Sequence, residues 1–230
     1  MIRISAFKWV PPFAQGVVRD LRVRWALEEA GLPYEARLID PEVQKSPDYR
    51  GQQPFGQVPV FEENGLILFE TGSIVLHLGE RSEVLLPRDP AARARAITWV
   101  FAALNSVEIF VMQLADIDLF AAGEEWTKQR RPQVEQALRR RLTDVATWLG
   151  DREYLEGRFT AGDLMMTTVL RILRHTDVLD AYPTLKAYKE RCEARPAFQR
   201  ALAAQLEPFG QHGAVIDEVR ERLPRPADAR

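Results

Sequence analysis

The stretch QPFGQVPVFEENGLILFETGSIVLHLGER, residues 53–81, decides the fold. Its two apolar runs, VPVFEE and LILFE, are typical of short strands, and the Asn64-Gly65 pair between them is a strong hairpin-turn signal. A helix should follow, with Thr71 or Ser73 available to cap its first turn. The stretch therefore predicts an antiparallel hairpin followed by a helix.

The residues before this stretch alternate between strand and helix patterns. Residues 2–7 predict a strand, residues 17–30 a helix that stops at Gly31, and residues 32–40 a second strand. Residues 41–56 are rich in Pro, Gly and polar side chains, and predict an irregular segment with one short helix. Because a helix joins the first two strands, they should be parallel, in contrast to the hairpin strands. The order is that of a thioredoxin-like α/β domain.

Strand signals stop after a proline-rich link at 84–93, and the rest of the chain has helical periodicity. The sequence after Phe209 has low hydrophobicity and predicts a terminal extension. We expect an α/β thioredoxin-like domain over residues 1–82, an all-α helical domain over 88–209 and a C-terminal extension over 210–230. The expected helices of the second domain span 91–120 (one helix or two), 124–150, 160–175, 183–194 and 196–207.

Composition excludes several classes of protein. The 230 residues carry a net charge of −2, which gives no electrostatic reason to expect nucleic acid or an anionic membrane as a partner. A single cysteine, Cys192, excludes an internal disulfide framework and fits a reducing compartment. The apolar run at 97–107 is too short to span a bilayer, and the N-terminus lacks a signal-peptide core. We expect a cytoplasmic protein.

Metal binding is not expected. Three histidines, His77, His175 and His212, are scattered along the chain with no metal-ligand spacing relative to one another or to Cys192.

Four segments together resemble the cytosolic glutathione S-transferase superfamily. They are residues 53–81, RVRWALEEAGLPYE (22–35), YLEGRFTAGDLMMTTVL (154–170) and YPTLKAYKERCEARPAFQRAL (182–202). The first is specific and the others moderately so. The resemblance implies a thioredoxin-like domain followed by a helical domain, glutathione as cosubstrate, and a homodimer.

The 53–81 stretch carries the expected glutathione site. The resemblance implies a cis peptide bond before Pro59, so that the backbone of Val58 turns outward and pairs with the cysteinyl residue of glutathione. A trans proline opening an edge strand is the alternative. Thr71 opens a helix whose N–H groups favour the γ-glutamyl carboxylate, and Glu70 can take the ammonium group. The alternative is N-capping by Thr71 with Glu70 in solvent.

Other residues are weaker candidates. Gln57 can hydrogen-bond the peptide backbone, and Lys45 or Arg50 can meet the glycine carboxylate unless they are ordinary surface charges. The resemblance places the second substrate between the first loop and the long helix. Its candidate pocket residues, which core packing would explain equally, are Trp9, Phe13, Trp99, Phe101, Asn105 and Met112.

The segment TAGD in the helical domain predicts a structural cap. Thr160 would accept from the N–H of Asp163, and Asp163 would reach back to the N–H of Thr160, which is a capping box with Asp in place of Glu. The helix that follows is almost entirely apolar, so these residues should be structural and not catalytic.

The loop after the first strand departs from the family. Between Ala6 and Pro33 the chain has no Ser, Thr, Tyr, Cys or His, whereas the resemblance implies a Tyr, Ser or Cys near Val17. Three alternatives remain. Backbone amides of Gly16, Val17 and Val18, with the Gln15 side-chain amide and the charge of Arg19, stabilise the thiolate. A hydroxyl comes from elsewhere, such as Ser5 or the helical domain. Or the bound glutathione is not activated.

The sequence therefore leaves two function classes. The leading one is a detoxifying glutathione transferase that uses the glutathione thiolate on an apolar electrophile. The alternative is a non-catalytic glutathione-binding or carrier protein with the same fold. Cysteine-dependent reductase chemistry is disfavoured, because the loop has no cysteine.

Overall fold

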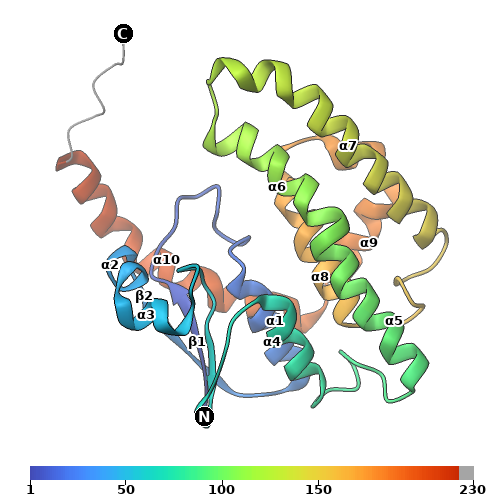
Figure 1. Cartoon of the computed structure of the whole chain (residues 1–230), viewed down its shortest axis with the longest axis horizontal. Coiled ribbons are helices and arrows are strands. Elements are labelled where there is room, and N and C mark those ends of the chain that lie inside the picture. The colour runs from blue at the N-terminus through green and yellow to red at the C-terminus, as the bar shows by residue number, and fades with distance from the viewer. Residues whose placement is uncertain (223–230) are drawn as a thin grey trace.

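A computed structural model describes the backbone of residues 1–222 and the side chains of residues 1–212. Figure 1 shows the small sheet with α1 to α4 around it in one half of the molecule, and the helices α5 to α9 in the other half. The last helix, α10, returns to the sheet side and packs against α1. The observed architecture is the predicted one, a thioredoxin-like α/β part followed by an all-helical part.

The sheet has four strands in the order β2-β1-β3-β4. The strand β1 pairs in parallel with β2 and antiparallel with β3, and β3 pairs antiparallel with β4. Asn64 and Gly65 both have positive φ angles, 50° and 82°, as the predicted tight hairpin requires. The strands are Ile2–Phe7 (β1), Tyr34–Ile39 (β2), Phe61–Glu63 (β3) and Leu66–Leu68 (β4).

The helix α1 spans Asp20–Ala30 and begins three residues later than predicted. Residues 11–19 form turns instead, in which the N–H of Val17 donates to the carbonyl of Ala14. The region 41–56 is also more ordered than predicted, with two short helices, Pro41–Lys45 (α2) and Pro47–Gln52 (α3). Each begins with a proline after a capping Asp or Ser side chain.

The helix α4 spans Thr71–Gly79, and its N-cap is Glu70, with no side-chain cap. The prediction that Thr71 or Ser73 caps this helix is therefore wrong. The Thr71 hydroxyl instead accepts a hydrogen bond from Arg22 of α1, at 3.3 Å.

A continuous helical stretch from residue 90 to residue 120 opens the second part. It contains two π-helical segments, and it continues as one helix through both of them. In order, it consists of α5 (Pro90–Phe101), η1 (Ala102–Glu108), α6 (Ile109–Ala115) and η2 (Asp116–Phe120).

The remaining helices lie close to their predicted positions. Pro132 lies inside α7, not in its first turn. The elements are α7 (Glu125–Leu149), α8 (Ala161–Arg171), η3 (Ile172–His175), η4 (Val178–Ala181), α9 (Pro183–Glu193) and α10 (Pro196–Arg222).

The last helix is much longer than the predicted 196–207. It continues through the first part of the expected extension, while residues 223–230 lie outside the described residues. Within the predicted range, the Gln205 amide donates to the carbonyl of Val18 and to a carboxylate oxygen of Asp20. These bonds hold α10 against the start of α1.

One hydrophobic core runs through both parts of the molecule. Trp25 of α1 is fully buried and lies 4.8 Å from Phe198 of α10 and 5.5 Å from Phe159, between ring centroids. Such aromatic packing fixes the sheet part against the helical part. The two sides of any cleft between them are therefore held in register.

The predicted capping box at the start of α8 is present. The Asp163 carboxylate accepts from the N–H groups of Thr160 and Leu155, both at 2.9 Å, and from the Tyr188 hydroxyl. The Thr160 hydroxyl accepts from the N–H of Gly162. These bonds satisfy the buried end of an apolar helix, as predicted, and burial raises the pKa of Asp163.

The stretch 90–120 is the one helix in the described chain that is long and apolar enough to cross a membrane, by length and composition alone. In this fold it packs against α7 and α8. A helix of a soluble core satisfies the same criteria.

Candidate functional site

Two cavities meet where the sheet part faces the helical part. The first, here called the polar pocket, has a volume of about 320 Å³. The second, here called the apolar pocket, has a volume of about 280 Å³. Three residues line both cavities: Arg19, Gln57 and Val58.

The sheet part supplies one wall of the polar pocket. The Val58–Pro59 peptide bond is cis, as predicted. No described hydrogen bond uses the backbone N–H or C=O of Val58, which lies outside the strands and helices. Glu70 and Thr71, at the start of α4, line the same cavity. The wall thus combines the backbone N–H and C=O of Val58, the N-terminus of α4 at Thr71 and the carboxylate of Glu70.

The opposite wall contains a cluster of three charged side chains, two of which are buried. Arg19, Arg22 and Glu108, here called the arginine cluster, join α1 and its preceding turn to η1. One oxygen of Glu108 accepts from Arg19 at 3.1 Å and from Arg22 at 3.0 Å. Arg22 also donates to Thr168 of α8 and to Thr71. A single carboxylate therefore faces two guanidinium groups at the domain junction.

Burial affects the pKa of both buried members of the cluster, Arg22 and Glu108. It lowers the pKa of Arg22, a shift that the charge of Glu108 opposes. Burial alone would raise the pKa of Glu108, but the charges and hydrogen bonds of Arg22 and Arg19 outweigh it and hold the pKa below its ordinary value. Glu108 is therefore ionised at neutral pH, and the cluster has a net charge of +1.

The π-helical segments carry pocket residues. Asn105 and Glu108 of η1 line the polar pocket, and Leu119 and Phe120 of η2 line the apolar pocket. A π-helical turn rotates the residues that follow it relative to a regular α-helix, and such turns are frequent at functional sites. The same long helix thus contributes to both cavities.

The apolar pocket is lined mainly by hydrophobic side chains from the first loop and the helical part. Phe13 lies edge-on to Phe120, with ring centroids 5.6 Å apart. The polar side chains that line it are Arg19, Gln44, Gln57, Arg174 and His175. The other hydrophobic residues around the cavity are Phe7, Ala14, Val17, Val18, Val58, Met112, Ala115, Leu119 and Ile172.

Two arginines of the helical part hold the first loop in place. The Arg171 guanidinium donates to the carbonyl of Gly16 at 2.7 Å, and that of Arg174 donates to the carbonyl of Phe13 at 2.8 Å. Gly16 has a φ of 78°, and a Cβ there would lie 3.2 Å from Arg171. The loop is therefore closely fitted to the end of α8 and to η3.

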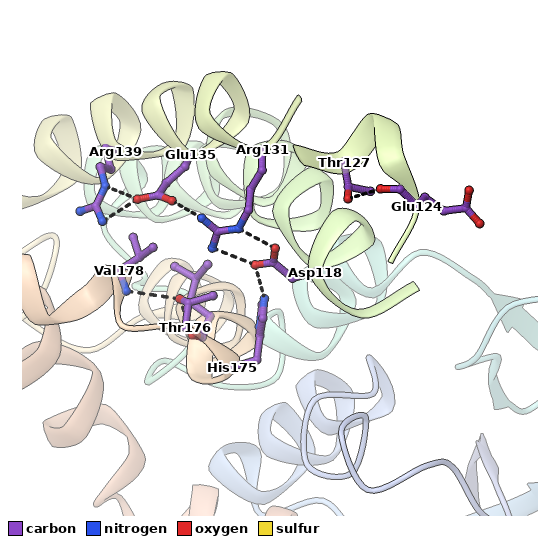
Figure 2. A network of polar contacts seen from close by, with 10 residues as sticks. Asp118, Glu124, Thr127, Arg131, Glu135, Arg139, His175, Thr176 and Val178 are labelled. Carbon is purple, nitrogen blue, oxygen red and sulfur yellow. Dashed lines mark hydrogen bonds and ion pairs between the residues drawn. The ribbon is translucent and has the colours of Figure 1, made fainter. Parts of the chain in front are cut away.

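A polar network supports the far wall of the apolar pocket (Figure 2). Asp118 of η2 accepts from Arg131 of α7 at 2.7 and 3.1 Å, and its Oδ2 lies 3.4 Å from Nε2 of His175. The His175 Nδ1 bonds the carbonyl of Ile172 at 2.9 Å, which requires a proton on that nitrogen. These contacts fix η2, α7 and η3 relative to one another.

The structure brings most of the predicted site residues together. Five of the six predicted glutathione-binding residues line the polar pocket. Asn105, which was predicted for the pocket of the second substrate, also lines the polar pocket and not the apolar one. Phe13, Val17, Val18 and Met112 line the apolar pocket. The five in the polar pocket are Gln57, Val58, Pro59, Glu70 and Thr71.

Phe101, also predicted for the pocket, is exposed and lines neither cavity. Three further predicted residues lie elsewhere. Lys45 ends α2 and is exposed outside both pockets. Trp9 lines a separate cavity with His212, because the loop carries it away from the helical part. Trp99 faces the other side of its helix, stacks on Trp148 and donates to Glu156. The expected placement of these three side chains is corrected accordingly.

The loop amides predicted to stabilise a thiolate are partly occupied. The backbone N–H groups of Gln15 and Val17 donate to carbonyls within the turn, and the Gln15 side chain donates to Val10 at 3.1 Å. Neither Gln15 nor Gly16 lines the two pockets. Ser5, another candidate, is buried and bonded to Tyr49 and Val60.

Sequence reasoning missed the buried members of the arginine cluster. Arg22 lies between Leu21 and Val23 in α1, and Glu108 follows an apolar run. A lone charge in an apolar helical stretch is the signal that could have found Glu108, because such charges are buried only when they are paired. Arg22 lies in a helix with several other charged residues, so no comparable signal marks it. No group of three or more metal-ligating side chains occurs among residues whose side chains are described.

A thioredoxin-like sheet, a helical part and a polar peptide-sized pocket at their junction define a glutathione-binding transferase. The sequence matches the family models for the glutathione S-transferase N-terminal domain over residues 14–80 and C-terminal domain over residues 102–196. The chain belongs to the cytosolic glutathione S-transferase superfamily and is a glutathione S-transferase.

Relatives of known name agree with this assignment. The chain is 30% identical over 203 residues to "Probable glutathione S-transferase GSTF1" of Oryza sativa subsp. japonica, covering 82% of this chain and 92% of that protein. It is 30% identical over 202 residues to "Glutathione S-transferase 1" of Zea mays, covering 81% and 92%.

Solved structures also agree. A glutathione transferase family member from Pseudomonas fluorescens pf-5, crystallised with two glutathione bound, has a TM-score of 0.76 and 26% identity. The match covers 87% of this chain and 92% of that one.

Proposed function

We propose that this transferase conjugates the glutathione thiolate to an apolar electrophile. The observation that carries this proposal is the junction of the two pockets at Arg19, Gln57 and Val58. A peptide thiol bound at Val58 would lie at the edge of a hydrophobic cavity. Holding a nucleophile and an electrophile side by side accelerates their reaction, provided that the reacting atoms are aligned.

The polar pocket supports a definite orientation of glutathione. The γ-glutamyl carboxylate would bind the N-terminal amides of α4 at Thr71, and the ammonium group would bind Glu70. The cysteinyl backbone would pair with Val58, and Gln57 would bond the peptide. Lys45 and Arg50 do not line this pocket, so we assign neither of them to the glycine carboxylate.

We further propose that the protein acts as a cytoplasmic homodimer. Large hydrophobic side chains remain exposed on the single chain, including Phe55 on the sheet part and Phe101 and Ile109 on the long helix. Exposed hydrophobic side chains of this size are typical of protein interfaces when they form a contiguous patch. Light scattering of the purified protein would give the subunit number.

The test of the function is glutathione-dependent consumption of an electrophile. Chlorodinitrobenzene and an organic hydroperoxide would be assayed first, then a broad panel of apolar electrophiles. Turnover that requires glutathione supports the transferase. Measurable glutathione binding with no turnover on any member of the panel would favour the carrier protein instead.

A further inference from the structure

We propose that Arg19 is the catalytic residue that stabilises the glutathione thiolate, in place of the hydroxyl or thiol that the first loop lacks. This inference rests on the proposed function, and it names the group that acts on the sulfur. It is carried by the position of Arg19, by its contacts and by the charge of the arginine cluster.

Position is the first argument. Arg19 is the one charged side chain among the described residues that lines both the polar and the apolar pocket. Glutathione bound in the polar pocket can reach an electrophile in the apolar pocket only through the shared boundary. The sulfur must therefore lie at this boundary, beside Val58 and Arg19.

The contacts of Arg19 are the second argument. Its Nε and Nη2 both donate to Glu108 Oε1, at 3.2 and 3.1 Å, which fixes the plane of the guanidinium group. The described contacts leave Nη1 available. The Arg19 side chain is 38% exposed, whereas that of Arg22 is 3% exposed and is bonded to Thr71, Thr168 and Glu108. Arg19 can reach a ligand, and Arg22 cannot do so without losing its bonds.

Charge is the third argument. Two guanidinium groups share one carboxylate oxygen in the arginine cluster, so one positive charge is not neutralised. The negative charge of Glu70 does not neutralise this remaining positive charge, because in the proposed binding mode Glu70 pairs with the ammonium group of glutathione. A cation near a thiol favours the thiolate and lowers its pKa.

The chemical step uses only glutathione and the electrophile. The bound thiol loses its proton to water, and the thiolate forms an ion pair with Arg19. With chlorodinitrobenzene, the sulfur electron pair forms the new carbon–sulfur bond, and chloride leaves with the electrons of the broken carbon–chlorine bond. Arg19 stays protonated throughout, so no further reactant is needed.

The test compares Arg19→Gln with the wild-type enzyme. The pKa of the bound thiol is read from the ultraviolet absorbance of the thiolate in the saturated binary complex. We expect Arg19→Gln to raise this pKa by about one unit, which corresponds to about tenfold less thiolate below the wild-type value. At a pH below the wild-type thiol pKa, kcat/KM of Arg19→Gln with chlorodinitrobenzene should be about tenfold lower than that of wild type. Above the raised pKa of the variant, its kcat/KM should approach the wild-type value. Arg19→Lys should retain most of the effect.

Two controls separate a charge effect from a loss of binding. Arg81→Gln removes an arginine of the same exposure, 39%, paired with Glu63 outside both pockets, and should change neither quantity. S-methylglutathione has no ionisable thiol, so Arg19→Gln should leave its affinity within about threefold of wild type, measured by calorimetry.

Each unexpected result is decisive. An unchanged thiol pKa in Arg19→Gln overturns the assignment. So does an equal loss of affinity for S-methylglutathione and glutathione, since Arg19 would then hold the peptide and not the sulfur. Glutathione bound to wild type with an ordinary thiol pKa overturns this inference alone. Failure of wild type to bind glutathione overturns the proposed function as well.

Discussion

The polar and apolar pockets share a boundary but are built in different ways. The polar pocket takes Val58, Glu70 and Thr71 from one continuous stretch around the β3–β4 hairpin, and the arginine cluster from α1, its preceding turn and η1. The apolar pocket takes side chains from the first loop, η2 and η3, three segments that lie far apart in the chain. The hairpin stretch supplies one wall of the polar pocket, and α1 and η1 supply the other, whereas tertiary packing assembles the whole lining of the apolar pocket.

This difference also divides the chemistry between the pockets. A pocket with preset hydrogen-bonding groups suits one constant ligand, because each unpaired polar group discriminates against other ligands. A hydrophobic pocket discriminates weakly between substrates of similar size. A constant glutathione and a variable electrophile fit this division.

The largest effect is expected for Glu108→Gln, which removes the shared carboxylate at the centre of the polar pocket. Arg22 would remain buried without an ionised partner. Breaking a buried pair on one side costs about 3–5 kcal/mol of stability. Urea unfolding would measure this loss. The matched control is Glu63→Gln, whose ion pair with Arg81 is partly exposed, for which we expect a loss below about 1 kcal/mol.

The same pair gives a pH prediction. The pKa of Glu108 in the folded protein lies below its ordinary value of 4.5, because Arg22 and Arg19 outweigh its burial. Its ionised form therefore contributes stability above about pH 4.5, and this contribution is lost as the pH falls through the lower folded value. The stability difference between wild type and Glu108→Gln should shrink in acid. A difference that is constant from pH 7 to pH 3 would contradict the pairing.

The next effect is expected for Glu70→Ala, which removes one charge from the polar pocket and leaves the apolar pocket unchanged. A hydrogen bond to a charged group contributes about 1.5–3 kcal/mol, so glutathione affinity should fall roughly 10- to 150-fold. Calorimetric titration would measure it. Glu70→Gln should have a similar effect, since it lacks the charge.

The control for this prediction is Glu80→Ala, at the other end of α4, whose carboxylate pairs with Arg93 outside both pockets. Its glutathione affinity should equal that of wild type. Unchanged affinity in Glu70→Ala would mean that the ammonium group binds elsewhere.

The comparison also explains which parts could be predicted from the sequence. The hairpin and the start of α4 follow from local signals, namely Asn64-Gly65 and the strand-to-helix change near Thr71, whereas the cis bond before Pro59 was expected from the family resemblance. The capping box of Thr160 and Asp163 is equally local and was predicted correctly. The wall of the polar pocket that the hairpin stretch supplies could therefore be predicted from the sequence.

The residues that line the apolar pocket were harder to predict from the sequence, for a physical reason. Trp99 and Met112 both lie on the long helix, and their spacing cannot show which one faces the first loop. The π-helical segment between them changes the rotation of the helix, and the hydrophobic periodicity of the sequence does not reveal it. The loop itself forms turns that α8 and α10 stabilise, so the predicted helix start at 17 moved to Asp20. The division into domains at 82 and 88 stays a prediction.

The smallest effect is expected for Met112→Trp, which changes the apolar pocket alone. The larger side chain would fill part of a cavity of about 280 Å³, so large electrophiles should bind less well. We expect KM for chlorodinitrobenzene to rise about tenfold, or about 1.4 kcal/mol, with glutathione affinity unchanged. Steady-state kinetics with each substrate varied in turn would measure both.

Trp99→Phe is the matched control, since Trp99 lies on the same long helix but contacts Trp148 and Glu156 away from both pockets. Its KM values should equal those of wild type. A rise in KM for the electrophile in Trp99→Phe, with none in Met112→Trp, would place the second substrate on the opposite face of the helix. The electrophile would then not bind next to the glutathione sulfur at the boundary of the two pockets, and Arg19 would not lie at the reacting atoms.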